Sequence, residues 1–255
     1  MTLLEVHALK KTYTTRLGGH LVPALTHVDF SAEQGEYLAI MGESGSGKTT
    51  LLNILATLDQ PTGGQVLLDG KDLAKIRERD LAEFRRKNLG FVFQDFNLLD
   101  TFSLRDNIYL PLVLSGMHYG EMEARLAPLA KKLAIEGILD KYPYEVSGGQ
   151  KQRAAVARAC ITGPRLLLAD EPTGALDSRS ADQLLDLFAQ LNREGQTILL
   201  VTHSARAASR AGRVLFIKDG EVYHQLYRGD RSNEAMFSQI ADTLTALAGG
   251  GADRG

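Results

Sequence analysis

The chain has 255 residues, of which 44% are hydrophobic and 24% charged, and its formal net charge is −2. This length can bury a sizeable core and allows one or two domains. The near-neutral balance gives no indication of a strongly basic surface, so we expect no nucleic acid among the partners. A single cysteine, Cys160, excludes an intrachain disulfide and fits a reducing cytoplasm.

We expect neither a signal peptide nor a membrane-spanning helix. Residues 1–7 lack the basic start and the long apolar run of a signal peptide. Apolar stretches such as residues 108–114 are much shorter than the ~20 residues that a spanning helix needs. The sequence therefore predicts a soluble chain that reaches a membrane only through a partner.

The first 93 residues predict short strands with two intervening helices. The strands are expected at residues 3–6, 28–30, 37–41, 65–68 and 89–93. Residues 37–41 are the clearest strand, because a continuous apolar run ending at a glycine is typical of a buried strand. The helices are expected from Lys48 to about Leu58, before a turn at residues 61–64, and at residues 73–87.

Helical patterns dominate residues 97–162, with helices expected at residues 104–116, at residues 120–139 and after Gly149. The alternation then resumes, with strands at residues 166–169, 197–201 and 214–217, a helix at residues 180–192 and a hairpin turn at Asp219-Gly220. This order predicts an α/β fold whose mostly parallel sheet is covered by helices. A final helix and a disordered glycine-rich end are expected within residues 231–255.

Residues 42–49 match the phosphate-loop pattern G-x-x-x-x-G-K-[ST] without a mismatch, between a predicted buried strand and a predicted helix. Glycines let backbone N–H groups face phosphate oxygens, and the helix start adds its positive dipole end. We expect Lys48 to neutralise the β- and γ-phosphates and the Thr49 hydroxyl to ligate Mg²⁺. A flexible glycine turn is the alternative, which the flanking elements disfavour. The expected nucleotide-binding residues are Gly42, Ser44, Gly45, Ser46, Gly47, Lys48, Thr49 and Thr50.

Two carboxylates, Asp170 and Glu171, follow the apolar strand at residues 166–169. The carboxyl ends of parallel strands lie at one edge of a sheet, so these acids should face the phosphate loop. We expect Asp170 to hold Mg²⁺, largely through water. Glu171 is expected to orient and polarise the attacking water. The alternative is a pair of solvated turn acids before Pro172.

Residues 147–150, Ser-Gly-Gly-Gln, lie at an expected helix start before the acidic pair. A capped helix alone would explain them. Together with the phosphate loop and the acids, however, they resemble the signature motif of ATP-binding cassette (ABC) proteins. The resemblance covers about residues 3–225. It implies an ATP-binding domain at residues 1–230, with a RecA-like P-loop NTPase core, an antiparallel β subdomain and a helical subdomain at about residues 97–162.

The resemblance also implies the remaining catalytic residues. Gln94 resembles the family's Q-loop glutamine, which would reach Mg²⁺ or the lytic water. His203, which follows Val201-Thr202, resembles the switch histidine that contacts the γ-phosphate. A structural glutamine and a structural histidine are the alternatives. The expected catalytic set is therefore Glu171, His203 and Gln94, and the expected metal ligands are Thr49, Gln94 and Asp170.

Two copies are expected to pack head to tail around two ATP molecules. Tyr13 resembles the aromatic residue that stacks on adenine, although a core tyrosine is the alternative. Asp177 resembles the D-loop aspartate near the opposite subunit. The resemblance implies that the nucleotide bound by one copy is completed by residues of the other copy, namely Ser147, Gly149 and Gln150.

A single cassette resembles the motor subunit of a bacterial transporter, docked on a transmembrane permease at the cytoplasmic face of the cell membrane. Residues 42–55, 91–99 and 168–177 are closest to the macrolide-exporter, lipoprotein-release and bacitracin-resistance ATPases. Residues 107–116 and 225–230 look most like the peptide-antibiotic branch. For residues 225–230, a basic turn that leads into the final helix is the alternative. The resemblance thus implies ATP hydrolysis coupled to antimicrobial-peptide export or resistance. The alternatives are lipoprotein release, macrolide export, a soluble ABC ATPase of DNA repair or translation, and a scaffold that binds ATP without turnover.

Overall fold

The central strands are short apolar runs, β3 (Tyr37–Met41), β7 (Leu166–Asp170) and β8 (Thr197–Val201), in which every residue except Asp170 is buried. Successive side chains of a strand point to opposite faces, so both faces of such strands need a cover. In β3, Ala39 and Met41 join one hydrophobic cluster, whereas Leu38 and Ile40 join another. The apolar sequence of these strands therefore requires helices on both sides of the sheet.

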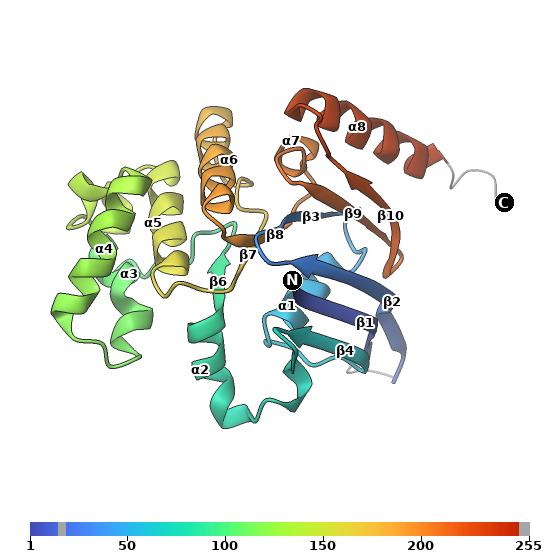
Figure 1. Ribbon diagram of the computed structural model, residues 1–255, viewed down its shortest axis with the longest axis horizontal. Coiled ribbons are helices and arrows are strands. Elements are labelled where there is room, and N and C mark those ends of the chain that lie inside the picture. The colour runs from blue at the N-terminus through green and yellow to red at the C-terminus, as the bar shows by residue number, and fades with distance from the viewer. Residues whose placement is uncertain (15–18, 250–255) are drawn as a thin grey trace.

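The computed structural model describes residues 1–14 and 19–249 and shows these covering helices. In Figure 1, α6, α7 and α8 lie above the central strands β3, β8 and β7, and α1 and α2 lie below these strands. The helical group α3 to α5 lies beyond β6, at the left of the view. The helices are α1 (Lys48–Leu55), α2 (Glu78–Asn88), α3 (Leu104–Val113), α4 (Tyr119–Leu133), α5 (Gly148–Cys160), α6 (Ser178–Arg193), α7 (Ala205–Ala208) and α8 (Asn233–Gly249).

The strands form one sheet in the order β5-β4-β1-β2-β10-β9-β3-β8-β7-β6. The segment β9-β3-β8-β7-β6 is parallel, whereas β1, β2, β4 and β5 pair antiparallel, as do β9 and β10. The predicted fold class, a mostly parallel core with an antiparallel β part and added helices, is confirmed. The other strands are β1 (Thr2–Thr14), β2 (Leu21–Glu33), β4 (Gly63–Leu68), β5 (Lys71–Asp72), β6 (Leu89–Val92), β9 (Arg213–Lys218) and β10 (Glu221–Tyr227).

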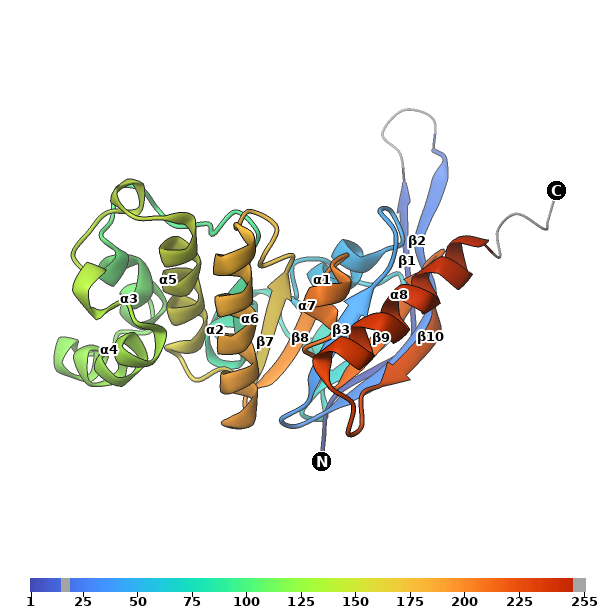
Figure 2. The same cartoon turned by 90° about the horizontal axis from the view of Figure 1, so that it is seen from above.

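Several elements differ in length from the sequence-based expectation. The N-terminal strands β1 and β2 each span 13 residues and extend beyond their neighbours, as Figure 2 shows. The predicted helix at residues 120–139 ends at Leu133, because Ala134 adopts a left-handed conformation with φ of 51°. Helix α1 ends at Leu55 rather than near Leu58. Gly249 belongs to α8, and the rest of the predicted disordered end lies outside the described residues.

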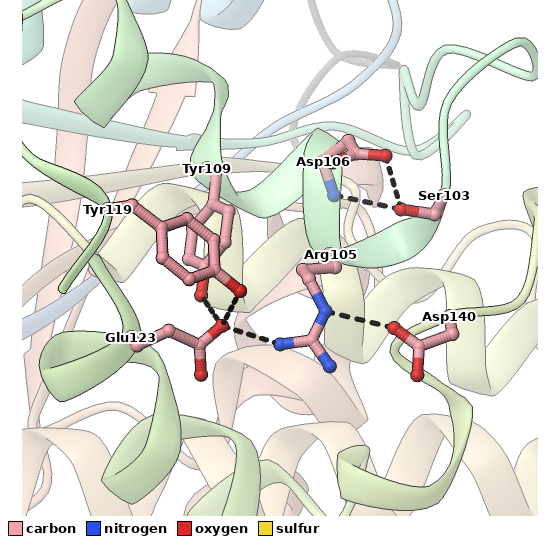
Figure 3. A network of polar contacts seen from close by, with 7 residues as sticks. All are labelled: Ser103, Arg105, Asp106, Tyr109, Tyr119, Glu123 and Asp140. Carbon is pink, nitrogen blue, oxygen red and sulfur yellow. Dashed lines mark hydrogen bonds and ion pairs between the residues drawn. The ribbon is translucent and has the colours of Figure 1, made fainter.

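One carboxylate, that of Glu123 in α4, connects α4 to α3 (Figure 3). Its Oε1 accepts hydrogen bonds from the Tyr109 hydroxyl, from the Tyr119 hydroxyl at 3.1 Å and from Arg105 Nη1 at 2.7 Å. Arg105 Nε in turn donates to Asp140 at 2.9 Å. The hydrogen bond from Tyr109, followed by those from Tyr119 and Arg105, lowers the pKa of Glu123. The network thus fixes the packing of the two helices.

Replacing Tyr109 by phenylalanine should destabilise the protein by about 1–2 kcal/mol, because a nearly buried hydroxyl then no longer donates to a charged carboxylate. Urea unfolding at neutral pH measures this loss. Since the folded-state pKa of Glu123 lies below its unfolded value, the stabilisation is complete above the unfolded pKa and is lost as the pH falls through the folded one.

Tyr119→Phe is the matched control, since Tyr119 donates to the same oxygen but is 62% exposed. Water can replace the lost partner of an exposed group, so this variant should lose less than Tyr109→Phe. Equal losses in the two variants would contradict the assigned importance of the buried bond.

Candidate functional site

Polar residues follow four neighbouring parallel strands at the edge where the strands end. The phosphate loop follows β3, Glu171 follows β7, His203 follows β8 and Gln94 follows β6. The ladder aligns Ile40 and Asp170 with Val201, so these strand ends are level. The fold therefore brings segments more than 150 residues apart in the chain to one edge, as expected for a parallel sheet.

The phosphate loop needs its glycines for two measurable reasons. Gly45 and Gly47 have φ of 82° and 100°, in the left-handed region that side chains disfavour. A Cβ on Gly47 would lie 2.4 Å from the Ala24 carbonyl oxygen, and one on Gly42 would lie 2.2 Å from that of Ile217. At Gly42, Gly45 and Gly47 the loop thus follows a path that only glycine fits. Helix α1 begins directly after the loop, and the first N–H groups of a helix have no partner within it.

A cavity of about 340 Å³ opens at this edge of the sheet. It brings together most of the residues predicted to act on a nucleotide. Its lining consists of Ala24, Ser44, Gly45, Gly47, Lys48, Thr49, Thr50, Asp170, Glu171, Val201 and His203. Phosphate-loop residues and acidic residues therefore face one common space.

Lys48 lies within the curve of the phosphate loop. Its Nζ donates to the carbonyl oxygens of Gly42 at 2.8 Å and Glu43 at 2.7 Å. Burial lowers the pKa of Lys48, and the charges of Glu171 and Asp170 oppose this shift. A partly desolvated ammonium group flanked by N–H donors is well suited to bind an anion such as a triphosphate.

On the acidic side of the cavity, the surroundings disfavour the charged form of Asp170. Burial raises the pKa of Asp170, the charge of Glu171 raises it further, and Lys48 opposes both effects. Within the described residues, no group of three or more His, Cys, Asp or Glu side chains is arranged to hold a metal ion. Mg²⁺ bound with a nucleotide does not need one, because water and phosphate oxygens supply most of its ligands. The donor set around Asp170 and Thr49 fits such an ion.

Three donors hold the Glu171 carboxylate. Its Oε1 accepts from the backbone N–H of His203 and lies 2.7 Å from both this nitrogen and His203 Nδ1, while Thr202 Oγ1 donates to Oε2 at 2.9 Å. The backbone φ of Glu171 is 43°, a strained value of the kind that concentrates at functional sites. Glu171 and His203 are therefore coupled directly, with Thr202 fully buried behind them.

Gly42 and Ser46 of the phosphate loop lie outside the cavity lining, and so do Tyr13 and Gln94. The Tyr13 hydroxyl donates to Asp59 at 2.8 Å, and the Lys11 Nζ lies 4.8 Å from the centre of the Tyr13 ring. The ring is 40% exposed, so part of it remains available to another group. Gln94 packs against Gly174, because a Cβ added to this glycine would lie only 3.0 Å from Gln94 Cδ. The predicted roles of Tyr13 and Gln94 stay predictions.

The residues assigned to the opposite nucleotide also lie apart from the cavity. Ser147 caps α5 by accepting from Gln150 N–H at 3.3 Å, and the Gln150 side chain accepts from Ser147 N–H at 2.9 Å. Gly149 lies beside Ser180 at the start of α6. Asp177 caps α6 through Arg179 and Ser180, and the hydrogen bond from Ser180 lowers its pKa. Local capping thus accounts for part of these motifs.

Three residues with clear contacts at the site were missed by the sequence reasoning. Thr202 binds Glu171, Asp59 holds both Tyr13 and Lys11, and Gln152 connects α5 to the strand ends. Thr202 directly precedes His203, and Gln152 follows the Ser-Gly-Gly-Gln motif. No neighbouring residue in the sequence indicates a role for either side chain. Their partners are distant in sequence, which explains the omission.

The sequence profile described as "ABC transporter" matches residues 25–174, more than half of the chain. The chain belongs to the ABC transporter family. It is 53% identical over 250 residues to an uncharacterised ABC transporter ATP-binding protein, YvcR of Bacillus subtilis, covering 98% of this chain and 96% of the relative. It is 46% identical over 250 residues to the bacitracin export ATP-binding protein BceA of Halalkalibacterium halodurans, covering 98% of each.

The fold of this family member is also that of a solved cassette. The dimeric post-hydrolysis state of the ATP-binding cassette MJ0796, bound to ADP and phosphate, matches with a TM-score of 0.80 and 36% identity over 88% of this chain and 98% of that one. The predicted resemblance to ABC ATP-binding subunits is confirmed, and the chain is an ATPase of that family. Among the helices of the described residues, none is both long and apolar enough to cross a bilayer.

Replacing Lys48 by alanine should weaken ATP binding on the order of 100-fold, because the ammonium group forms charge-assisted hydrogen bonds with phosphate oxygens. Calorimetric titration of MgATP measures the change. Lys87→Ala is the control, since that exposed lysine pairs with Glu83 on α2. Unchanged affinity of the Lys48 variant would remove this residue from the site.

Proposed function

We propose that the chain is the motor subunit of a bacterial peptide-antibiotic transporter and works at the cytoplasmic face of the cell membrane. Two copies would close on two ATP molecules and drive a transmembrane permease. The observation that carries this proposal is the cavity at the strand ends, which joins Lys48 and Glu171 in one space. The proposal rests further on the full-length similarity to BceA.

The phosphate loop holds the triphosphate in this proposal. Its N–H groups and the start of α1 surround the phosphate oxygens, and Lys48 moves from the Gly42 and Glu43 carbonyls to the β- and γ-phosphates. Thr49, Asp170 and Gln94 would hold Mg²⁺, which supplies charge neutralisation at the phosphates when bound. Tyr13 would stack on the adenine with its exposed ring.

Hydrolysis depends on the carboxylate of Glu171. The Glu171 carboxylate orients a water molecule and accepts a proton from it, so that the water oxygen attacks the γ-phosphorus in line. The bond between the γ-phosphorus and the β–γ bridging oxygen breaks, and ADP leaves. His203 donates to Glu171 through its backbone and Nδ1, which directs the opposite ring nitrogen, Nε2, outward. With a proton on both ring nitrogens, Nε2 would donate a hydrogen bond to the γ-phosphate. Thr202 keeps the carboxylate in place.

Each nucleotide would lie between two copies of the chain. Ser147, Gly149 and Gln150 do not line the cavity of their own chain, which leaves them available to a partner. The Ser147 oxygen accepts from Gln150 N–H, yet its O–H remains able to donate to a phosphate. Head-to-tail packing of two copies would place this group near the partner's γ-phosphate, and the similar cassette MJ0796 is dimeric.

The permease would dock in a groove between the sheet edge and the helical group. The groove is open and mostly apolar, with a volume of about 410 Å³, and it includes Phe93, the residue before Gln94. Leu58 and Leu114 line it and are 56% and 62% exposed. Exposed apolar surface of this kind is typical of an interaction site. The segment at about residues 97–162 would act as the subdomain that transmits the movement, within an ATP-binding domain of residues 1–230.

The proposed cargo is an antimicrobial peptide of the bacitracin type. BceA, a bacitracin export ATP-binding protein, is matched along 98% of its length, which fits a separate ATPase subunit of the same organisation. Residues 42–55, 91–99 and 168–177 also resemble macrolide-exporter and lipoprotein-release ATPases, which makes those two the alternative cargo classes.

Replacing Glu171 by glutamine should preserve MgATP binding and lower kcat about 10²- to 10⁴-fold, because an amide cannot accept the proton of the attacking water. The ATP-bound dimer should then accumulate, since closure is no longer followed by hydrolysis. Phosphate release and size-exclusion chromatography with MgATP measure the two effects.

Glu83→Gln is the control, since this exposed carboxylate lies on α2 and pairs with Lys87. It should leave turnover and oligomeric state unchanged. Normal hydrolysis by the Glu171 variant would show that another group activates the water.

Replacing Leu114 by glutamate should release the chain from its permease, because a carboxylate would replace apolar surface in the docking groove and attract the arginines that also line it, Arg85, Arg86 and Arg158. Copurification from bacterial membranes measures this loss. In the intact complex, bacitracin should raise ATP turnover, and the Leu114 variant should lose the rise while its basal ATP binding remains.

Phe237→Glu is the matched control, since this residue is 44% exposed on α8, away from the groove. Stimulation by a macrolide or a lipoprotein instead of bacitracin would support the alternative cargo classes and overturn the peptide proposal. Retained copurification of the Leu114 variant would remove the permease from this groove.

A further inference from the structure

Gln152, in the second turn of α5, is a polar residue with no exposed surface. Its Nε2 donates to the carbonyl oxygen of Phe93 at 3.0 Å and to that of Pro172 at 2.6 Å. Both partners are acceptors, so only the amide nitrogen can face them. The orientation of this side chain is therefore determined by its surroundings.

The two carbonyls belong to the segments that carry the proposed catalytic side chains. Phe93 directly precedes Gln94, and Pro172 directly follows Glu171. Helix α5, which holds Gln152, begins next to Ser147. One amide group thus connects the helix that faces the partner's nucleotide to two catalytic segments of its own chain.

Other close contacts join the same three segments. A Cβ added to Gly148 would lie 3.6 Å from Leu176 and 3.7 Å from Phe96. Gly174 likewise packs against Gln94. These segments leave little free space between them, and packed interiors transmit displacement rather than absorb it. A shift of α5 would therefore move the loop from Glu171 to Asp177.

The other end of the Gln152 amide is unusual. Its Oε1 is buried and has no hydrogen-bond partner among the described residues. An unpaired buried acceptor is unfavourable, which makes Gln152 a poor choice for a position that serves packing alone. The two hydrogen bonds from Nε2 are what this residue contributes.

We propose that Gln152 is a positioning residue for ATP hydrolysis that holds the Glu171 loop to helix α5 of the same chain. Through this link, α5 and the Glu171 loop move together when α5 engages the nucleotide of the partner copy. This inference rests on the proposed shared sites. Gln152 does not line the nucleotide cavity, so it acts on kcat and leaves the affinity for ATP unchanged.

Mixed dimers separate this role from simple packing. Two differently tagged copies are coexpressed, and the mixed dimer is isolated by two successive affinity steps. One copy carries Glu171→Gln, so that MgATP is hydrolysed only at the Glu171 of the other copy. Gln152→Leu is then placed either in the copy with intact Glu171 or in the Glu171→Gln copy. Leucine keeps most of the volume and removes both donors.

The expected result is a loss of at least about 10-fold in kcat when Gln152→Leu accompanies the intact Glu171, with KM for ATP within about 3-fold of the control. The dimer that carries Gln152→Leu in the Glu171→Gln copy should keep most of its ATP turnover. Val156→Ala, a buried change in the same helix, is the packing control and should leave kcat of the folded dimer largely intact. The inference is overturned if kcat falls equally in both arrangements, if Val156→Ala lowers kcat as well, or if Gln152→Leu does not lower kcat in either arrangement.

A further variant distinguishes failure of this inference from failure of the proposed shared sites. Ser147→Arg in the Glu171→Gln copy should abolish turnover, because that copy supplies Ser147 to the live site. If Ser147→Arg leaves turnover intact, the sites are not shared between copies and the proposed mechanism of closure fails. If Ser147→Arg abolishes turnover but Gln152→Leu in the copy with intact Glu171 has no effect, only the positioning role of Gln152 fails.

Discussion

The structure depends on one constraint: strands that are apolar on both faces must be buried on both faces. Parallel strands of this kind can place polar groups only at their ends, and β3, β7 and β8 end in the phosphate loop, Asp170 and Val201. The carboxyl edge therefore collects groups of opposite charge that no local segment contains. The catalytic chemistry follows from the burial of the strands, since the same packing that stabilises the sheet determines which loops meet.

Desolvation gives this edge its electrostatic character. Burial disfavours the charged forms of both Asp170 and Lys48, and the acid and the base oppose that effect in each other. Such a site favours a ligand that carries a multivalent anion together with a cation, since each compensates a group of opposite sign. Magnesium nucleotides have this composition, so the charge pattern and the proposed substrate agree without any assumption about the shape of the base.

Local patterns predicted the fold class and the loop from Gly42 to Thr49, because short-range spacing determines both. They did not predict the length of β1 and β2, where several register shifts interrupt the pairing, or the end of α4 at a left-handed alanine. Gln152 escaped notice because its partners lie 59 and 20 residues away. Contacts of this kind arise from the tertiary arrangement. For the candidate site, the sequence indicated most of the residues that line the cavity, but not which side chains hold them in place.

The left-handed backbone of Glu171 sets stability against the proposed catalytic role of this residue. Glycine would adopt a φ of 43° without strain, so a protein engineer in search of heat resistance would choose that substitution first. The same change would delete the carboxylate to which Thr202 and His203 donate. Substitutions chosen to stabilise this protein should therefore leave Glu171 unchanged, although relief of its backbone strain promises the largest gain. The strained backbone and the proposed catalytic carboxylate belong to the same residue.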